Sequence, residues 1–326
     1  MTSQISRGRS FLSALYRPQA QSLAERRARM AWLMVAPALL LLFTVAAWPL
    51  FKTIVYSFTD ATLTTTGALH FVGLANYLDL SGDTAFGVLA DSLWWQAVTN
   101  TLWFTLVTVT LELIFGLAIA LLLNQKFVGR GILRTAILVP WAIPTIVSAK
   151  MWGWMFHDQY GLINDLLSRI GIISEPLAWV AVPELSMWAV IIAEVWKTTP
   201  FMVLMLLAAM QVVSEDLYEV ARLEGASAWQ RFRYVTMPLI WPAMVVALIF
   251  RSLDALRVFD LIYVLTSNSE STMSISGYAR QVLVDYQDMG GGSAASVLVF
   301  MLVAGVAICY LLFGKVRLND SGEVNG

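Results

Sequence analysis

Eight ionisable residues lie inside long apolar stretches of this 326-residue chain. They are Glu112, Lys150, Glu194, Lys197, Arg251, Asp254, Arg257 and Asp260. A charge at the centre of a bilayer costs about 2.5–3.5 kcal/mol on insertion scales, so each one needs a reason to be there. The last four are spaced three residues apart, which places an acid beside a base on a helix. Two interpretations stay open: ion pairs within the protein, or groups lining a path for a polar solute. For Arg251 and Lys52, near span ends, extension of the charge to the interface is a further explanation.

Aromatic and hydroxyl side chains accompany several of these charges. Flat rings beside hydrogen-bonding groups suit a polyhydroxylated solute such as a sugar. Proline next to them frees a backbone carbonyl, which is tolerated where a helix borders protein or a water-filled cavity. Trp196 to Thr198 precede Pro200, and Trp141 lies between Pro140 and Pro144. The candidate solute contacts are Trp141, Trp196, Lys197, Thr198, Asp254, Arg257, Asp260, Tyr263 and Asn268.

Long apolar helices must position these groups. The chain is 58% hydrophobic and only 13% charged, whereas a soluble domain is about a quarter charged. Because a span needs roughly 20 apolar residues, we expect six transmembrane helices near 31–52, 97–123, 135–156, 185–210, 239–266 and 293–313. The fold class is therefore an all-α integral membrane protein. The other tryptophans, including Trp94, Trp95, Trp152 and Trp154, are expected to anchor at the membrane interfaces.

Lys and Arg are distributed unequally between the two sides of these spans. Fourteen fall on one side: Arg7, Arg9, Arg17, Arg26, Arg27, Arg29, Lys126, Arg130, Arg134, Arg222, Arg231, Arg233, Lys315 and Arg317. The opposite loops, 59–96, 157–184 and 267–292, contain only Arg169 and Arg280. The positive-inside rule then predicts that both termini are cytoplasmic. These opposite loops are rich in turn-forming residues, although Tyr160 to Leu167 could form a short amphipathic helix.

One cytoplasmic loop, residues 214–238, has the pattern of two short helices joined at a glycine. Ser214 can cap the first helix, whose apolar residues include Leu217 and Ala221. Gly225 ends it in a left-handed conformation. Ser227 to Gln230 fits a capping box for the second helix, which Pro238 is expected to close. An apolar face this close to the membrane needs a surface to pack on, either its own helix bundle or another chain.

The composition excludes several functions. A net charge of −1 and no basic patch interleaved with aromatics argue against nucleic acid. The single cysteine and two histidines offer no metal cluster, and no serine sits in a nucleophile motif. A phosphate-binding GxxxxGK[ST] pattern is also absent. If ATP drives this protein, another chain must hydrolyse it, so we expect no enzyme activity and no cofactor on this chain.

The loop resembles a known family. Glu219-Val220-Ala221, then Gly225, then Met237-Pro238 is similar to the EAA loop of type I ABC importer permeases, with mild departures at Val220, Glu224 and Met237. The segments Phe71 to Tyr77, Arg134 to Pro140, Glu194 to Met202 and Phe250 to Asp260 resemble the carbohydrate-uptake (MalF/UgpA-like) permeases, especially the SugA-like permeases of trehalose importers. The resemblance covers about residues 30–313.

This resemblance implies a role and a set of partners. A basic cytoplasmic segment (1–29) would precede a six-helix permease domain (30–313), and a cytoplasmic tail (314–326) would follow. Glu219, Ala221 and Gly225 would couple the chain to an ATPase. The implied partners are a second MalG-like permease, two ATP-binding subunits holding ATP and Mg, an extracytoplasmic sugar-binding protein and the bilayer of a bacterial inner membrane.

Two alternatives stay open for the function. An ABC permease for glycerol phosphate or another polyol would need cations facing the path, for which Lys150, Lys197 and Arg257 are the candidates. An ion-driven secondary transporter would suit buried carboxylates such as Glu112 and Asp254. That class often shows an internally repeated half, which is not apparent here, and the loop would then lack a docking partner.

Overall fold

The computed structural model describes residues 25–64, 69–80 and 84–313, and within them the chain is helical, with isolated β-bridges but no strand. The expected N-terminal segment and tail fall largely on residues 1–24 and 314–326, which lie outside the described residues. The chain divides into two units, up to Val55 and from Tyr56 onward. Each unit is described by itself.

Within its described residues the first unit is one long helix, which begins at Glu25 and ends at Tyr56, the first residue of the second unit. Its apolar residues cover the whole circumference, and nearly all of its side chains are exposed. A π-helical segment, Phe43–Ala47, precedes α2, Trp48–Tyr56. The Thr44 hydroxyl donates to the backbone oxygen of Leu40 at 3.1 Å, so this polar group is satisfied within the helix. The helix includes the predicted first span and is longer at both ends.

Four further helices of the described chain are long and apolar enough to cross a membrane. They are α3 (Ser92–Asn124), α7 (Pro183–Gln211), the helical run Ala228–Ala255 and α13 (Met289–Phe313). A bent pair, α4 (Arg130–Ala142) and α5 (Thr145–Met155), brings the total to six if it counts as one span. The expectation of apolar spans is thus confirmed, and the described residues contain five or six of them.

The predicted third span is not one straight helix. Its two halves meet at 93° over a short break. Pro144 caps α5, and proline disfavours the helical conformation of the residue before it. Ile143 accordingly has extended backbone angles (φ −75°, ψ 133°). Local proline chemistry therefore produces the bend.

The predicted fifth span also differs from expectation at both ends. Pro238 does not close the second short helix, because α9 (Ala228–Arg231), a π-helical segment (Phe232–Thr236) and α10 (Met237–Ala255) form one continuous run. Pro238 lies within this run, one residue after Met237, whose N–H donates to the Phe232 oxygen in the π-helical pattern. The run ends at Ala255, and α11 (Asp260–Thr266) follows after a break.

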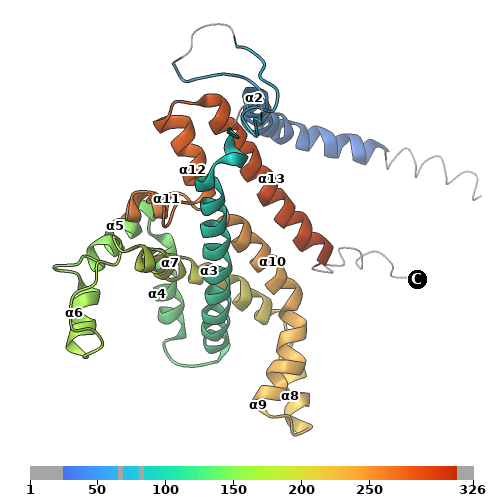
Figure 1. Cartoon of the computed structure of the whole chain (residues 1–326). Coiled ribbons are helices and arrows are strands. Elements are labelled where there is room, and N and C mark those ends of the chain that lie inside the picture. The colour runs from blue at the N-terminus through green and yellow to red at the C-terminus, as the bar shows by residue number, and fades with distance from the viewer. Residues whose placement is uncertain (1–24, 65–68, 81–83, 314–326) are drawn as a thin grey trace, which may run out of the picture. The chain divides into compact units, whose positions relative to one another are not determined.

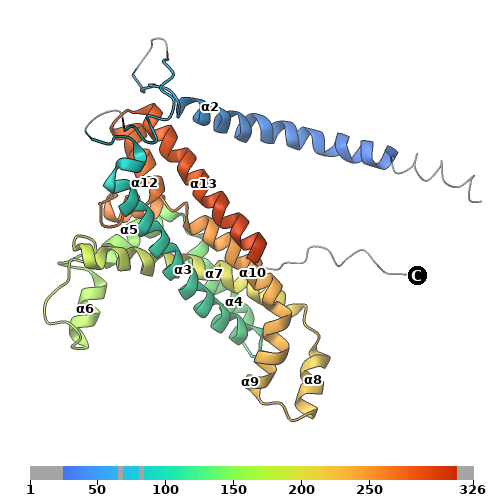
Figure 2. The ribbon, with the colours of Figure 1, turned by 45° about the vertical axis from the view of Figure 1, so that its right-hand side comes forward.

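The core of the second unit forms where α3, α7 and α10 lie side by side (Figures 1 and 2). Close approach of α3 and α7 depends on Gly116, since a Cβ there would stand 2.6 Å from Cγ of Met202. Some buried threonines return their hydroxyls to their own helix, as when Thr108 donates to the Phe104 oxygen at 2.7 Å. Such threonines enter the apolar interior without losing hydrogen bonds, whereas the buried Thr105 hydroxyl finds no partner within the described part of the chain.

The segments outside the long helices contain more helix than their turn-forming residues indicate. The expected short helix after residue 160 is present as α6, Leu162–Arg169. The segment 267–292, expected to be irregular, contains α12 (Ile275–Arg280) and a π-helical segment (Gln281–Asp285). Both pack against α13. This packing buries Ala279 and Val282, which explains a helix that local residue types do not predict.

Candidate functional site

A single buried arginine joins three helices of the second unit. Arg251 on α10 is 3% exposed. Its Nε donates to Glu112 Oε2 on α3 at 2.6 Å and its Nη2 to Glu112 Oε1 at 2.8 Å, a bidentate pair. The same Nη2 lies 3.1 Å from Glu194 Oε1 on α7, and Nη1 binds Asp254 at 2.5 Å. The explanation that Arg251 extends to the interface is therefore wrong, because its partners hold it in the interior.

Thr198 completes this ionic cluster. Its hydroxyl lies 2.6 Å from Glu112 Oε1 and 2.7 Å from the backbone oxygen of Glu194. It also accepts from Arg251 Nη2 at 3.3 Å. Because a buried charge is costly unless it is paired and hydrogen-bonded, this saturation explains how the cluster is retained. Internal pairing is thus confirmed for Arg251 and Asp254, two of the four charges spaced three residues apart.

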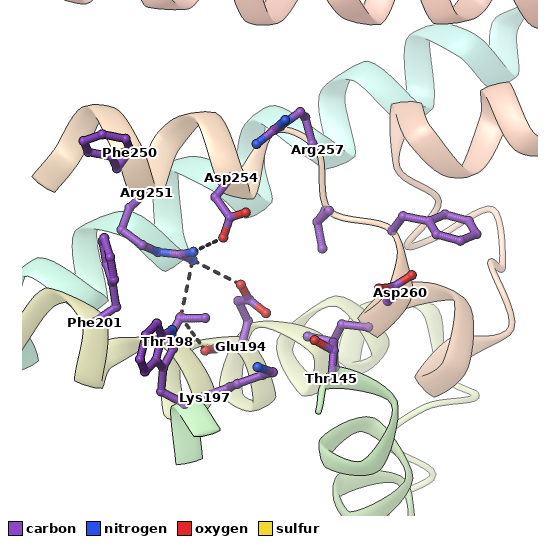
Figure 3. Close-up of a pocket in the computed structure, with 14 residues that line it drawn as sticks. Thr145, Glu194, Lys197, Thr198, Phe201, Phe250, Arg251, Asp254, Arg257 and Asp260 are labelled. Carbon is purple, nitrogen blue, oxygen red and sulfur yellow. Dashed lines mark hydrogen bonds and ion pairs between the residues drawn. The ribbon is translucent and has the colours of Figure 1, made fainter. Parts of the chain in front are cut away.

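A cavity of about 450 Å³ opens beside the cluster, at the break between α10 and α11. We call it the central cavity (Figure 3). Six of the nine candidate solute contacts line it: Trp141, Lys197, Thr198, Asp254, Arg257 and Asp260. They come from four helices and from the break after α10, so the fold brings together residues that are up to 119 positions apart.

The other three candidates lie elsewhere. Trp196 packs edge-on against Trp152, with ring centroids 5.7 Å apart. Tyr263 stacks on Phe259 and lies under the Arg280 guanidinium, 4.5 Å from its ring centre. Asn268 follows α11 in a left-handed conformation, and its amide nitrogen approaches the Gly277 oxygen at 3.4 Å. None of the three is among the residues that line the central cavity.

Tryptophan burial also differs from expectation. Trp94 is 3% exposed and packs against Tyr278, and Trp152 is 7% exposed within the core near α5 and α7. Interface anchoring is therefore wrong for these two. Trp95 and Trp154, at 53% and 57% exposed, have the accessibility that anchoring requires. The sequence does not distinguish the buried pair from the exposed pair, because all four tryptophans flank or enter apolar stretches.

Several residues of the central cavity were not among the candidates. They are Thr145, Glu194, Phe201, Phe250, Arg251, Val258, Phe259 and Leu261. A signal for four of them exists in the sequence. Glu194 and Arg251 are charges within apolar stretches, Phe201 follows Pro200, and Phe250 adjoins Arg251. The Trp141 and Phe201 ring centroids are 6.3 Å apart, which makes an aromatic wall on one side of the cavity.

The charges lining the central cavity are balanced. Glu194, Asp254 and Asp260 stand against Lys197, Arg251 and Arg257. Carboxylates accept hydrogen bonds and cations donate them, so the lining offers both to hydroxyl groups. Lys150, expected as a third path-facing cation, is exposed on α5 and does not line the cavity. The chemistry suits an uncharged solute with many hydroxyls better than an anion.

The loop 214–238 forms the elbow that the sequence predicts. Its first helix is α8, Glu215–Leu223, and the Ser214 hydroxyl accepts from the Asp216 N–H at 3.3 Å. Gly225 has φ +78° and ends the helix. The N–H of Ala226 donates to the Ala221 oxygen and that of Gly225 to the Arg222 oxygen, which is the Schellman pattern. The capping box of Ser227 and Gln230 is present too.

The apolar face of the elbow is not covered by its own helices. Leu217, Val220 and Leu223 are 46%, 56% and 88% exposed, and Trp229 is 66% exposed. Glu219 is also exposed, Ala221 is half-buried, and a Cβ on Gly225 would meet open space. The Tyr218 hydroxyl meets that of Thr236 at 3.0 Å and fixes α8 to the base of α10. The apolar face of the elbow therefore does not pack on the helices of its own chain.

Helices of this length and hydropathy, interrupted around a polar cavity, define a multi-pass membrane protein with the architecture of a solute permease. Residues 112–318 match the family described as the inner membrane component of binding-protein-dependent transport systems, and the chain belongs to that family.

Three similar proteins are described as permeases of transport systems. The trehalose/maltose transport system permease protein MalF of Thermococcus litoralis is 43% identical over 297 residues, covering 90% of this chain and 97% of that protein. The trehalose transport system permease protein SugA of Mycobacterium tuberculosis is 42% identical over 315 residues, with 96% and 97% coverage. The sulfoquinovosyl glycerol transport system permease protein SmoG of Agrobacterium fabrum is 37% identical, covering 86% of this chain and 89% of that protein.

The fold has a solved counterpart. A chain of a bacterial ABC transporter that imports the acidic polysaccharide alginate superposes with a TM-score of 0.75 and 20% identity. It covers 92% of this chain and 99% of its own length. At this identity the likeness concerns the fold, which is thus that of an ABC importer permease.

Proposed function

We propose that this chain is a permease subunit of an ATP-driven, binding-protein-dependent importer for a sugar, with trehalose or a related disaccharide such as maltose as the solute. The observation that carries the proposal is full-length similarity, above 40% identity, to two permeases described as trehalose or trehalose/maltose transporters. The central cavity supports it, because its lining of rings and balanced charges fits an uncharged polyhydroxylated molecule.

We further propose that the bent pair α4–α5 is one of six spans and that both termini are cytoplasmic. The excess of Lys and Arg on one side supports this orientation. Residues 30–313 would then form the permease domain in a bacterial inner membrane, between the cytoplasmic segment 1–29 and the tail 314–326. The elbow, 214–238, would lie in the cytoplasm.

In this proposal the central cavity is this chain's half of the sugar path. Trp141 provides the stacking face, Lys197 and Arg257 donate to sugar hydroxyls, and Asp254 and Asp260 accept from them. Thr198 is the positioning residue that ties the lining to the ionic cluster. Trp196, Tyr263 and Asn268, which do not line the cavity, would act on the path only at other stages of transport.

The elbow is the proposed coupling element. Helix α8, with Glu219 and Ala221, and the turn at Gly225 would dock on an ATP-binding subunit, which binds ATP and Mg. The uncovered apolar side chains support this role, since such a face is stable in water only when a partner covers it. The remaining proposed partners are a second permease, a second ATP-binding subunit and a sugar-binding protein outside the membrane.

Two other functions are less well supported. A phosphate ester would need an excess of cations in the path, whereas three carboxylates balance the three cations that line the central cavity. An ion-driven secondary transporter would leave the exposed elbow without a role, and the family match also argues against it.

The test is co-purification followed by uptake. A tagged chain extracted in mild detergent should bring a second permease and an ATPase, identified by mass spectrometry. The reconstituted complex should take up radiolabelled trehalose only with ATP and the binding protein, with maltose as a competitor. Recovery of the chain alone, active with an ion gradient, would overturn the proposal.

A further inference from the structure

A second cavity, of about 900 Å³, lies where the elbow meets the ends of two long helices. Asn124, the last residue of α3, and Gln211, the last of α7, both line it. Five cations also line it: Lys126, Arg130, Arg134, Arg222 and Arg231. Only two carboxylates, Glu215 and Glu219, oppose them among the described residues of the lining. We call this the basic cavity. Unlike the central cavity, it has an excess of three positive charges.

Most of this positive charge is not neutralised by the hydrogen bonds that these cations form. Lys126 Nζ pairs with Glu215 at 2.6 Å, and Arg222 is close enough to attract the same carboxylate. The arginines Arg130, Arg134 and Arg231 donate to backbone oxygens of Gln125, Leu123 and Ala226, at 3.3, 3.0 and 2.7 Å.

A backbone oxygen neutralises no charge, and a guanidinium has five N–H donors. Arg134 Nε is buried and finds no partner within the described part of the chain. The arrangement thus has spare donors and spare positive charge directed at one space, which is the requirement for binding an oxyanion such as a phosphate group.

The residues around the basic cavity indicate that the anion belongs to a membrane lipid. The floor of the cavity includes Leu121 and Met210, which belong to the apolar helices α3 and α7. Beside it, Val128, Ile132 and Val212 are 102%, 80% and 87% exposed. Fully exposed apolar side chains next to clustered cations, at the end of long apolar helices, indicate the boundary between hydrocarbon and headgroups.

We infer that the basic cavity binds the phosphate of an anionic phospholipid, with its acyl chains along the exposed apolar residues of α4. This inference rests on the proposed orientation, which places the elbow at the cytoplasmic leaflet. The lipid would fill the space between α3, α4 and α8 and so brace the elbow against the membrane. The ligand class is a phosphodiester with one negative charge, as in phosphatidylglycerol.

The first experiment needs no variant. The complex, or the chain if it purifies alone, is delipidated in detergent and titrated with short-chain phosphatidylglycerol or phosphatidylcholine. Native mass spectrometry counts the lipids that stay bound. We expect one phosphatidylglycerol to be retained at least tenfold more tightly than phosphatidylcholine. Equal retention of the two lipids would overturn the inference. The readout does not depend on transport, so it can fail while the sugar-importer proposal stands.

A double variant locates the site. Arg130→Gln with Arg222→Gln removes two cations, neither of which has a close salt bridge among the described residues. Because each cation near an anionic headgroup contributes about one kcal/mol, phosphatidylglycerol affinity should fall on the order of 30-fold. The matched control is Arg233→Gln, an exposed arginine of the same elbow that does not line the cavity. Equal losses in the variant and the control would overturn the location.

Two further experiments distinguish a bound lipid from a free anion and from a site that the partner ATPase creates. Inorganic phosphate added in the titration should not displace the bound lipid; displacement at millimolar phosphate would assign the cavity to a free anion instead. In the second arm, the partner ATPase is stripped from the complex. Retention that disappears with the ATPase would mean that the partner creates the site, and would overturn an assignment to this chain. Unchanged retention supports it.

Discussion

The central cavity and the elbow differ in whether their energetically unfavourable groups, buried charges in one and exposed apolar side chains in the other, have partners within the chain. In the ionic cluster beside the cavity, the buried charges of Arg251, Glu112 and Glu194 find partners within the chain. On the elbow, apolar side chains such as Leu223 and Trp229 stay in contact with water. The charges of the first region are therefore paired within this chain, while its own helices leave the apolar face of the second region uncovered. Changes in the first should damage the protein itself, and changes in the second should damage only what it does with partners.

The largest expected effect is on folding, from Arg251→Met. Removing the cation leaves Glu112 and Glu194 buried without a counter-charge, which costs about 3–5 kcal/mol for a broken buried pair. Thermal unfolding of the purified protein in detergent should show a much lower midpoint, or no folded protein. Adding Glu112→Gln should restore part of the loss. The control Arg257→Gln, at an exposed cation of the same helix end, should leave the midpoint nearly unchanged. Equal unfolding midpoints for both variants would show that the ionic cluster does not stabilise the fold.

The next effect is on coupling, from Gly225→Trp. The left-handed backbone costs a non-glycine residue about 1–2 kcal/mol, and the open space beside it lets the new ring protrude from the elbow. We expect membrane insertion to persist while ATP-driven uptake falls more than tenfold and ATPase activity no longer responds to sugar. Gly171→Trp is the matched control, because Gly171 has φ +76° and open space but lies outside the elbow. Normal uptake by Gly225→Trp would remove the docking role.

A smaller effect is expected on sugar affinity, from Trp141→Ala. Losing one aromatic face is worth about 0.5–1.5 kcal/mol, or up to about tenfold in KM. Folding should be little affected, since Trp141 is 48% exposed. Uptake kinetics measure KM and kcat separately. Trp154→Ala removes a similarly exposed ring outside the cavity and should leave KM unchanged. If both variants raised KM alike, the aromatic wall would not be a sugar contact.

The smallest effect concerns the pair between Lys126 and Glu215. The hydrogen bond from Lys126 holds the pKa of Glu215 below its ordinary value, and the Lys126 charge adds to the shift. A depressed carboxyl pKa contributes stability above the unfolded pKa, and that stability is lost as pH falls through the folded pKa. Because the pair is exposed, solvent and salt screen it. Lys126→Gln should therefore leave the unfolding midpoint unchanged at neutral pH. A marked drop there, abolished by salt, would mean that the elbow depends on this pair.

Residue type and spacing predict some of these features well. Gly225 and the capping residues Ser214 and Ser227 define the elbow through local backbone chemistry, and the structure has each of them in place. The helices follow from long apolar stretches in the same way. Six of nine candidate cavity residues also lie together, because charge in an apolar stretch is a strong signal.

The remaining features depend on distant contacts. Nothing near Arg251 in the sequence identifies Glu112 and Glu194 as its partners, and only the approach of α3 and α7 reveals them. Trp196 stands between two cavity residues along the chain but points toward Trp152, since adjacent residues on a helix face different directions. The helix α12 follows from packing against α13 rather than from its own residues. Local patterns do not contain this information.

The uninterrupted helical run from Ala228 to Ala255 has a mechanical consequence. Its 28 residues form a rod of about 40 Å. One end is the second half of the elbow, and the other end holds Arg251 and Asp254 at the central cavity. A tilt imposed at the elbow is therefore delivered to the ionic cluster without an intervening loop to absorb it. The rod can act as a lever, and the π-helical turn at Phe232–Thr236 and Pro242 are the places along it where a helix bends most readily.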